Sequence, residues 1–281
     1  MSLSQQDIDR VATLALEEDL AGGVDITTES TVDADRTDSA DFAARTAGVV
    51  AGIPVAAAIV ERRFAGRGSV ELLAADGDEV KAGDALLRIA GPTREILTAE
   101  RSALNILCHL SGIATLTAQW VEAVRGTGAV IRDTRKTTPG LRALEKYAVR
   151  CGGGRNHRMG LADQALIKDN HLIAAGGVAP ALRALQSRHP DVICEVECDT
   201  VDQVREAVES GARLVLLDNM ELAELRESVA IASPAGVATE ASGGLTLDRA
   251  RSVAETGVDF LSVGALTHSA PALDIGLDLR G

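Results

Sequence analysis

Residues 132–171 read RDTRKTTPGLRALEKYAVRCGGGRNHRMGLADQALIKDNH, and the rest of the sequence is organised around them. Between residues 132 and 158 this stretch carries eight Lys or Arg residues against two acids, a net charge of +6. The whole chain carries −13, so everything outside that window sums to −19. Positive charge concentrated in this way repels itself unless an anion lies among it. We therefore expect the segment to bind a highly anionic small molecule.

The overall composition is that of an acidic globular protein. A chain of 281 residues with 46% hydrophobic content can form two domains, or one large α/β domain with an appendage. Because the pI is near 4.9 and only five residues are aromatic, nucleic acid is not an expected partner. The N-terminus lacks the charge order of a signal peptide, and the longest apolar run, 47–60, is shorter than the ~20 residues of a membrane span. We expect a soluble, cytoplasmic protein.

The four cysteines are read as reduced thiols, since no secretory signal accompanies them. Cys194 and Cys198, with His189 nearby, invite interpretation as a metal site. They lie, however, in the extended run CEVEC, without the short ligand spacing of a zinc knuckle. We favour buried small residues for both.

The N-terminal part has the pattern of an α+β domain. An amphipathic helix is predicted over residues 4–20, capped by Ser4, and another helix over 54–65. Strands are expected near 40–51 and 69–75, with a hairpin at 76–84. A long helix over 92–125, broken at Ser111-Gly112, joins this part to the next. We find no catalytic constellation here.

Strand and helix patterns alternate from residue 129 onward, which indicates parallel strands joined by right-handed crossovers. Six such units in roughly 140 residues favour an open, incomplete α/β barrel, because a full eight-fold barrel needs about 200. Gly211 and Gly257 stand where helix C-caps belong. The strands are expected near 129–132, 165–168, 192–198, 213–217, 236–240 and 259–263, and the helices near 141–150, 171–187, 201–210, 220–230 and 247–256.

Each expected strand ends in charged residues or glycines. In α/β barrels the carboxyl ends of the strands meet at one rim, where the chemistry takes place. Six coincident ends therefore indicate a site. The residues concerned are 133–136, Lys168 and Asp169, Glu195 and Glu197, Asp218 and Asn219, Glu240 with 242–244, and Gly264.

The basic residues divide into two groups. Flanked by glycines and strand ends, one group provides donors for carboxylate or phosphate, with His157 as a further donor. The other group is spaced along a helix and is interpreted as surface ion pairs with the acidic remainder. The first group is Arg135, Lys136, Arg158 and Lys168; the second is Arg142, Lys146 and Arg150.

Carboxylates and glycine loops complete the inventory. Glu197 and Asp218 suit Mg²⁺ completed by water and substrate phosphates, whereas for Glu195 we weigh that role equally against pairing with the basic residues. The loops 241–246 and 263–268 place glycines before helices, as phosphate cradles do. For His268 a phosphate contact and a structural role stay open. The inventory describes transfer of a sugar phosphate to a carboxylated acceptor.

Seven segments together resemble one known family, the quinolinate phosphoribosyltransferases, also called nicotinate-nucleotide pyrophosphorylases (carboxylating). The similarity covers nearly the whole chain and is most specific at 132–171. The segments are AERSALNILCHLSGIAT (99–115), 132–161, ALIKDNH (165–171), CEVEC (194–198), LLDNM (216–220), EASGGL (240–245) and ETGVDFLSVGALTHS (255–269).

The resemblance implies a fold, a reaction and an assembly. The fold is an N-terminal α/β sandwich (1–112, joined by the C-terminal tail 270–281) followed by an open α/β barrel (113–269). The reaction converts quinolinate and 5-phosphoribosyl 1-pyrophosphate, with Mg²⁺, to nicotinate mononucleotide, pyrophosphate and CO₂. The assembly is a homodimer or larger, in which Arg101 enters the neighbouring active site. Spacing alone would make Arg101 a surface partner of Glu100.

The resemblance also implies roles for individual residues. Two quinolinate carboxylates are expected on Arg135, His157, Arg158 and Lys168, with Thr134 beside them. Lys136 is expected near the pyrophosphate, and Glu197 and Asp218 near the ribose and Mg²⁺, directly or through water. Lys136, Lys168, Glu197 and Asp218 are the expected catalytic residues. The 5-phosphate is expected on Ser242, Gly243, Gly244, Gly264 and Ala265.

Two alternatives stay open at this point. One is a relative of the same fold that acts on another pyridine carboxylate or belongs to a metal-uptake system. The other is a non-catalytic module that grips polyanions with the basic segment alone. The second gives no reason for Glu197 and Asp218 to share the rim with the basic residues.

Overall fold

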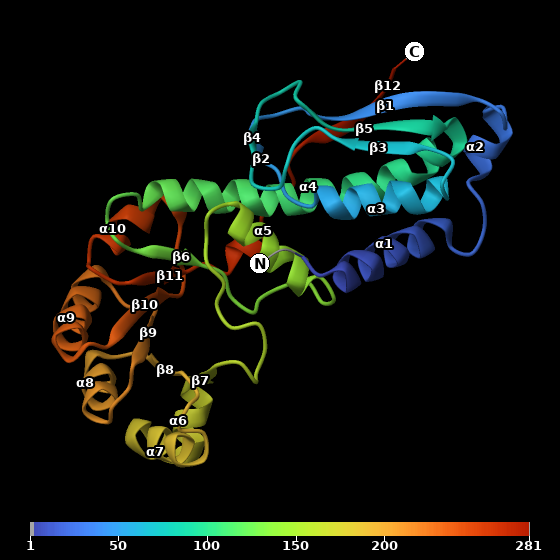
Figure 1. The fold of residues 1–281 in the computed structure, drawn as a ribbon. Coiled ribbons are helices and arrows are strands. Elements are labelled where there is room, and N and C mark those ends of the chain that lie inside the picture. Colours follow the sequence, from blue (N-terminus) through green and yellow to red (C-terminus); the bar gives the residue numbers. More distant parts are fainter. Residues whose placement is uncertain (1–2, 281) are drawn as a thin grey trace. The chain divides into compact units, whose positions relative to one another are not determined.

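The computed structural model describes residues 3–280 and contains two compact units. The first runs through Ala118 and also takes in Thr137–Gly153 and the chain from Leu266 on. The second consists of Gln119–Lys136 and Gly154–Ala265. Figure 1 shows the elements of both.

The first unit is built on an antiparallel sheet of order β12-β1-β5-β3. These strands are β1 (Thr37–Ala44), β3 (Ser69–Leu72), β5 (Ala85–Pro92) and β12 (Ile275–Arg280), and a small pair, β2 (Gly48–Val49) and β4 (Glu79–Val80), lies beside them. The helix α3 (Ile53–Phe64) packs on the sheet (Figure 1). Ala40 and Phe42 of β1 are fully buried and pair with Ile89 and Leu87. The strands on either side of the predicted hairpin, β3 and β5, pair antiparallel. The segment between them is not a simple turn, however, because Glu79–Val80 within it forms β4 and pairs with β2.

The N-terminal helices of this unit begin at side-chain caps. The first, α1 (Gln5–Leu20), starts at Ser4, whose hydroxyl accepts from the backbone N–H of Asp7 at 3.1 Å. A short helix, α2 (Ile26–Thr31), starts in the same way at Asp25. A hydroxyl or carboxylate oxygen in this position satisfies an N–H that has no partner within the helix. The predicted cap of the first helix is confirmed.

The long helix α4 (Thr93–Ala123) is unbroken, contrary to the break expected at Ser111-Gly112. The glycine has a different cause. A Cβ at Gly112 would overlap the carbonyl oxygen of Pro271 and lie 2.9 Å from the Cα of Ala272, so the helix needs Gly where this segment crosses it. The Ser111 hydroxyl accepts from the backbone N–H of Ala51 at 3.1 Å. Both residues of the apparent breaker are therefore explained by tertiary contacts.

The helix α5 (Arg142–Cys151) belongs to the first unit by its contacts, although its position in the sequence predicts a barrel helix. The expectation that Lys146 forms a surface ion pair is wrong, because its side chain is fully buried. Its neighbour Glu145 is equally buried and accepts hydrogen bonds from the backbone N–H of Thr138 at 3.1 Å and from His109 Nε2 at 3.0 Å. The helix thus packs on more of its circumference than its charged pattern indicates.

The second unit is an open sheet of six parallel strands in the order β6-β11-β10-β9-β8-β7. The predicted open, incomplete barrel is confirmed, with β6 and β7 as its two edges. The loop at Arg155 continues along the β6 edge through a parallel bridge to Arg132. The strands are β6 (Val130–Arg132), β7 (Ala165–Ile167), β8 (Cys194–Cys198), β9 (Leu214–Asp218), β10 (Ala238–Ser242) and β11 (Phe260–Ser262).

Helices lie on the outer side of this curved sheet (Figure 1). The helix expected over 171–187 is two helices, because Gly176 and Gly177 have φ of 85° and 127°. Gly211 and Gly257 have φ of 83° and 95°, which confirms both predicted caps. The helices are α6 (Asp169–Ala175), α7 (Val178–Arg188), α8 (Val201–Glu209), α9 (Leu222–Ala232), α10 (Ala250–Ala254), with the 3₁₀ turns η1 (Ser233–Ala235) and η2 (Leu247–Arg249); α11 (Ala265–His268) follows β11.

The charged residues of the longest helix lie in its first third and at Glu122 near its end. In α4 the pairs Arg94-Glu95 and Glu100-Arg101 stand among the apolar residues. Within residues 3–280, none of the helices combines the length and the apolar character that a membrane crossing requires.

Candidate functional site

A cavity of about 390 Å³ lies at the carboxyl ends of the parallel strands. Nine residues predicted as site residues line it. They come from the ends of β6, β7, β8, β9 and β10 and from the loop before β7, so the expected rim exists. The lining consists of Thr134, Arg135, Lys136, His157, Arg158, Lys168, Glu197, Asp218 and Ser242, with Leu166, Leu216, Glu240 and Ser262 in addition.

Five further predicted residues lie outside this lining. Gly243 and Gly244 line an adjoining cavity of about 150 Å³. Gly264 stands between β11 and α11, and Ala265 is the first residue of α11. Arg101 is an exposed residue of α4 in the first unit. His268, for which a phosphate contact and a structural role were left open, is also exposed, and its Nδ1 lies 2.6 Å from the Ser269 hydroxyl.

Asp133 connects the loop after β6, which carries Arg135 and Lys136, with the loop that carries His157 and Arg158. It follows β6 directly, is fully buried, and accepts hydrogen bonds from the backbone N–H of His157 at 2.8 Å and from the side-chain amide of Asn156. Leaving a buried carboxylate without partners would be costly, so these bonds fix the loop. The loop that carries Arg158 is thereby held against the end of β6.

Arg158 is held in a partly desolvated, positively charged environment. It is only 9% exposed, and one guanidinium nitrogen donates to the carbonyl oxygen of Gln164 at 3.2 Å. Burial, and next the neighbouring charge of Arg135, lower the pKa of Arg158 from its usual value. Like charges that line one cavity repel each other, so an anion that binds between them is favoured.

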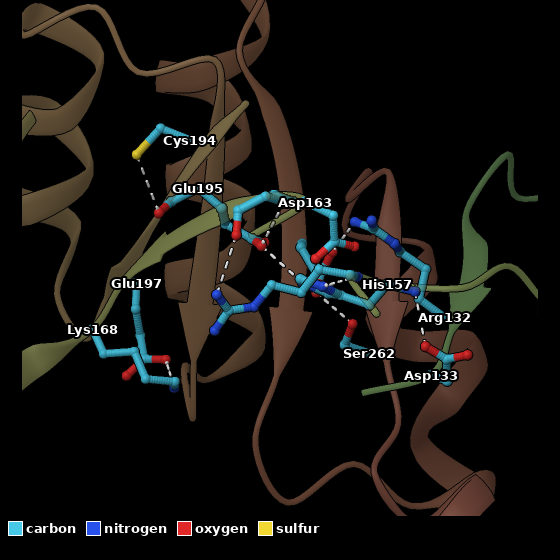
Figure 2. A network of polar contacts seen from close by, with 12 residues as sticks. Arg132, Asp133, His157, Asp163, Lys168, Cys194, Glu195, Glu197 and Ser262 are labelled. Atoms are coloured by element: carbon cyan, nitrogen blue, oxygen red, sulfur yellow. Dashed lines mark hydrogen bonds and ion pairs between the residues drawn. The ribbon is translucent and has the colours of Figure 1, made fainter. Parts of the chain in front are cut away.

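An ion pair joins the basic and acidic sides of the cavity. The Lys168 ammonium contacts the Glu197 carboxylate, and Figure 2 shows the two side chains together. Glu197 is 9% exposed, whereas the side chain of Lys168 is 47% exposed. Asp218 ends the neighbouring strand and accepts from the amide of Asn219 at 2.6 Å. Two carboxylates on adjacent strands of one wall are a donor set that fits Mg²⁺, which keeps waters and phosphate oxygens as its other ligands.

A buried polar network lies below the cationic residues. His157 Nε2 is 2.8 Å from Glu195 Oε2 and 3.4 Å from Glu240 Oε1. Glu240 also accepts from Arg132 and from the Ser262 hydroxyl. Burial raises the pKa of Glu195 to about 7, against the opposing effect of Arg132 and Arg158. Burial, and next the charge of Glu195, also raise the pKa of Glu240.

Sequence reasoning assigned no role to several members of this network. Glu240 was recognised at a strand end, and Asp133 as part of the rim, but neither was taken as a site residue. A signal did exist for Asp133, since it is one of only two acids in the basic window. Arg132 and Ser262 gave no comparable signal.

Cys194 and Cys198 are buried, free thiols on β8. Their sulfurs approach the backbone carbonyl oxygens of Glu195 at 3.6 Å and Val196 at 3.7 Å. Burial raises the pKa of the Cys194 thiol to about 11. The buried structural role predicted for both residues agrees with this environment. Among residues 3–280, the group that gathers three ligand-type side chains is instead His157 with Glu195 and Glu240.

The glycine loop after β10 is shaped by contact with Asn219. Gly243 and Gly244 have φ of 86° and 55°, and Asn219 itself has φ of 54°, in the left-handed region. The backbone N–H of Asn219 donates to the Ser242 carbonyl oxygen at 2.9 Å. A Cβ at Gly243 would overlap the Asn219 side chain and lie 2.8 Å from its backbone nitrogen. The loop after β9 therefore sets the path of the glycine loop.

We expect Gly243→Ala to raise the KM for a phosphorylated substrate about tenfold, because the loop must move away from Asn219, and 1.4 kcal/mol corresponds to a factor of ten. Gly236→Ala is the matched control. Gly236 also has a left-handed φ, of 70°, but no atom lies within 4 Å of its Cβ position. The control should lose roughly 1–2 kcal/mol of stability and keep its KM. Steady-state kinetics and thermal unfolding of both variants check this, and equal KM values would contradict it.

Models of known protein families match both parts of the chain. The one described as quinolinate phosphoribosyl transferase, N-terminal domain, matches residues 25–111, and the C-terminal domain of the same family matches 113–278. A curated relative from Mycobacterium leprae, named nicotinate-nucleotide pyrophosphorylase [carboxylating], is 51% identical over 269 residues, which are 94% of each chain.

Solved structures agree. The nicotinate-nucleotide pyrophosphorylase of Francisella tularensis superimposes with a TM-score of 0.93 at 35% identity, covering 99% of this chain and 98% of that one. The corresponding structure from Ehrlichia chaffeensis gives a TM-score of 0.92 at 37% identity, with full coverage of both chains. The similarity therefore spans both units.

Proposed function

Because this chain belongs to the quinolinate phosphoribosyltransferase family, we propose that it transfers a phosphoribosyl group to quinolinate and decarboxylates the product. The substrates are quinolinate and 5-phosphoribosyl 1-pyrophosphate, and the products are nicotinate mononucleotide, pyrophosphate and CO₂. The reaction is a step of NAD biosynthesis. The observation that carries the proposal is one cavity lined both by Arg135, Arg158 and Lys168 and by the carboxylates Glu197 and Asp218.

The cationic side chains suit a dianionic ring. Arg158 and Arg135 lower the energy of two carboxylates that would otherwise repel each other, through charge-assisted hydrogen bonds worth roughly 1.5–3 kcal/mol each. Lys168 gives a third positive charge, and Thr134 lies beside them in the lining. Burial, and next the charge of Arg135, lower the pKa of Arg158, and a dicarboxylate counters the second of these effects. The fit is therefore one of charge.

The transfer step needs no general base. The lone pair of the pyridine nitrogen forms a bond to C1 of the ribose while the bond from C1 to the pyrophosphate oxygen breaks, and its electron pair leaves with pyrophosphate. Positive charge develops on the ribose, where Glu197 and Asp218 stabilise it, and negative charge develops on the leaving group, where Lys136 does so. Mg²⁺ bound near Glu197 and Asp218 supplies further charge neutralisation to the pyrophosphate when present.

Decarboxylation follows on the ribosylated ring. The bond between C2 and its carboxylate breaks, the electron pair stays on C2 beside the positively charged nitrogen, and a proton from solvent replaces CO₂. Partial burial around Arg158 favours loss of the charged carboxylate, because a desolvated carboxylate is less stable than a solvated one.

The glycine loop, with Ser242 and the turn at Gly264 and Ala265, is proposed to bind the 5-phosphate through backbone N–H groups.

The direct test uses quinolinate labelled in the 2-carboxylate. Incubated with the phosphoribosyl donor and Mg²⁺, the protein should release labelled CO₂ and nicotinate mononucleotide in equal amounts. Product from nicotinate, and none from quinolinate, would assign the chain to another pyridine carboxylate. Tight binding of pyrophosphate without any turnover would assign it to the non-catalytic alternative.

Magnesium dependence is a separate proposal. We expect Asp218→Asn to raise the Mg²⁺ concentration that gives half-maximal activity about tenfold, because removal of one carboxylate weakens the site. Asp202→Asn, at an exposed position of α8, is the control and should leave that concentration unchanged. Activity measured over a Mg²⁺ series decides the matter, and identical curves for wild type and Asp218→Asn would refute a role for Asp218.

Assembly and location complete the proposal. We propose a homodimer or larger homo-oligomer in which Arg101, exposed on α4, completes the active site of a neighbouring subunit. A cytoplasmic location is proposed from the four free thiols, which a reducing compartment preserves.

A further inference from the structure

The imidazole of His157 has partners for both ring nitrogens within the protein. Its Nδ1 accepts a hydrogen bond from the backbone N–H of Arg158 at 2.7 Å. Its Nε2 lies 2.8 Å from Glu195 Oε2 and 3.4 Å from Glu240 Oε1 (Figure 2). The side chain of His157 is only 6% exposed.

These partners fix the tautomer. A backbone N–H can only donate, so Nδ1 must accept and carries no proton. Nε2 must then carry the ring proton of the neutral imidazole, and it donates that proton to the carboxylate of Glu195. The polar edge of the ring therefore points to Glu195 and Glu240, and a carbon edge remains for the cavity.

The carboxylates that receive His157 are themselves anchored. Glu240 is fully buried and accepts from Arg132, whose guanidinium lies 4.6 Å from the centroid of the Phe260 ring. Glu195 is fully buried on β8, and the same oxygen that faces His157 accepts from the side-chain amide of Gln164 at 3.2 Å. Among residues 3–280 the other oxygen, Oε1, has no hydrogen-bond partner.

We propose that Glu195 is a positioning residue of the quinolinate pocket: it orients His157, which in turn fixes the backbone at Arg158. The inference rests on the proposed function for the identity of the ligand. His157 then acts on the ligand through Arg158, and not as a hydrogen-bond donor to a carboxylate. This differs from the role that the resemblance implies for His157.

The backbone at Arg158 is held from two sides as a result. Asp133 accepts from the N–H of His157, and His157 Nδ1 accepts from the N–H of Arg158. Two consecutive backbone donors are therefore fixed by buried acceptors. A side chain whose backbone is fixed in this way loses less freedom when it grips a ligand, which favours binding.

Two substitutions of Glu195 distinguish a requirement for a hydrogen-bond acceptor from a requirement for a negative charge. Glu195→Gln keeps an oxygen for His157 Nε2–H and for Gln164, and places its amide where Oε1 has no partner. Glu195→Leu has similar size and accepts nothing. We expect Glu195→Leu to raise the KM for quinolinate at least tenfold with the donor KM within twofold. We expect Glu195→Gln to stay within about threefold for both.

The exposed Glu227→Gln is the matched control for loss of one carboxylate, and it should match wild type. Thermal unfolding reports whether each variant is folded. A quinolinate KM within twofold of wild type for a folded Glu195→Leu would overturn the proposal. So would equal defects in both variants, because the negative charge and not the acceptor would then matter.

A measurement on the wild-type protein keeps the proposal testable if Glu195→Leu does not fold. Imidazole ¹⁵N spectra of the full chain should show one histidine with a protonated Nε2 and an unprotonated Nδ1, assigned to His157 by its absence from His157→Gln. A spectrum with Nδ1 protonated would overturn the proposal. Failure of wild type to turn over quinolinate would instead refute the proposed function, so the two failures are distinguishable.

Discussion

Mixing Arg101→Ala with Lys168→Ala in equal amounts should restore about a quarter of wild-type activity to two proteins that are each inactive. In a two-fold dimer that shares its sites, half of the exchanged dimers contain one subunit of each kind. Each such dimer has one site with both residues and one site with neither. A quarter of all sites are therefore intact, which gives the restored fraction.

The single variants are inactive for separate reasons. Lys168→Ala removes the cation that contacts the buried Glu197 carboxylate as well as a donor in the cavity. The Lys168 side chain is 47% exposed, so the lost ion pair counts for less than a fully buried one. The lost charge-assisted hydrogen bond to the substrate, roughly 1.5–3 kcal/mol, corresponds to one to two factors of ten. Arg101→Ala removes a residue that lies in the first unit and outside the described lining of the cavity. Only if the site is shared between subunits can the intact residue of one variant replace the residue that the other variant lacks.

The matched control mixes Lys168→Ala with Arg158→Met. Both residues line the same cavity, so every mixed dimer still lacks one of them in each site, and activity should stay absent. Native mass spectrometry of subunits with different tags measures exchange directly. A mixture of Arg101→Ala and Lys168→Ala that exchanges fully and remains inactive would contradict the shared site.

Arg158→Met should lower kcat/KM for quinolinate about a thousandfold, because two charge-assisted hydrogen bonds of roughly 1.5–3 kcal/mol each are lost. The apolar stem is retained, so packing changes little. The donor KM should remain within threefold. The protein should stay folded, since the substitution removes a charge that is only 9% exposed and puts an apolar side chain in its place.

Arg226→Met, at an exposed position of α9, is the control for loss of one arginine and should match wild type. Arg158→Lys keeps the charge but not the planar fork, so it should recover only part of the loss. Steady-state kinetics with each substrate varied in turn measures both effects. A loss that falls equally on quinolinate and the donor would place Arg158 elsewhere in the site.

The strand ends were predictable because their signal is local. Each strand of the second unit is a short apolar run followed directly by charged or glycine residues, and parallel strands bring such ends to one edge. Nine of the predicted residues line one cavity for that reason. Gly211 and Gly257 were predictable in the same local way, since each follows its helix directly.

The network around Glu240 was not predictable, because it depends on the order of strands in the sheet. The edge strand β6 pairs with β11, and Arg132 stands in register with Ser262 although 130 residues separate them. Glu240 on β10 then faces both. Nothing in the local sequence says which strand lies next to β6. The anchoring of His157 follows from that adjacency.

The predictions at Gly176-Gly177, Ser111-Gly112 and Lys146 were wrong because tertiary contacts decide the structure there. Gly176-Gly177 ends a helix by left-handed backbone, whereas Gly112 stays helical because the chain at Pro271 needs the room. The local sequence does not show which of the two sites ends a helix. Lys146 is flanked by charge and looks exposed, yet the contacts of α5 bury it completely. Burial of this kind is set by how elements pack and not by their own periodicity.

A crystal structure with quinolinate bound tests the central claim most directly. The account predicts the ring in the cavity at the strand ends, with its carboxylates on Arg135, Arg158 and Lys168, and His157 still bonded to Glu195. Quinolinate bound away from these three cations, or the three side chains turned apart into solvent, would contradict it.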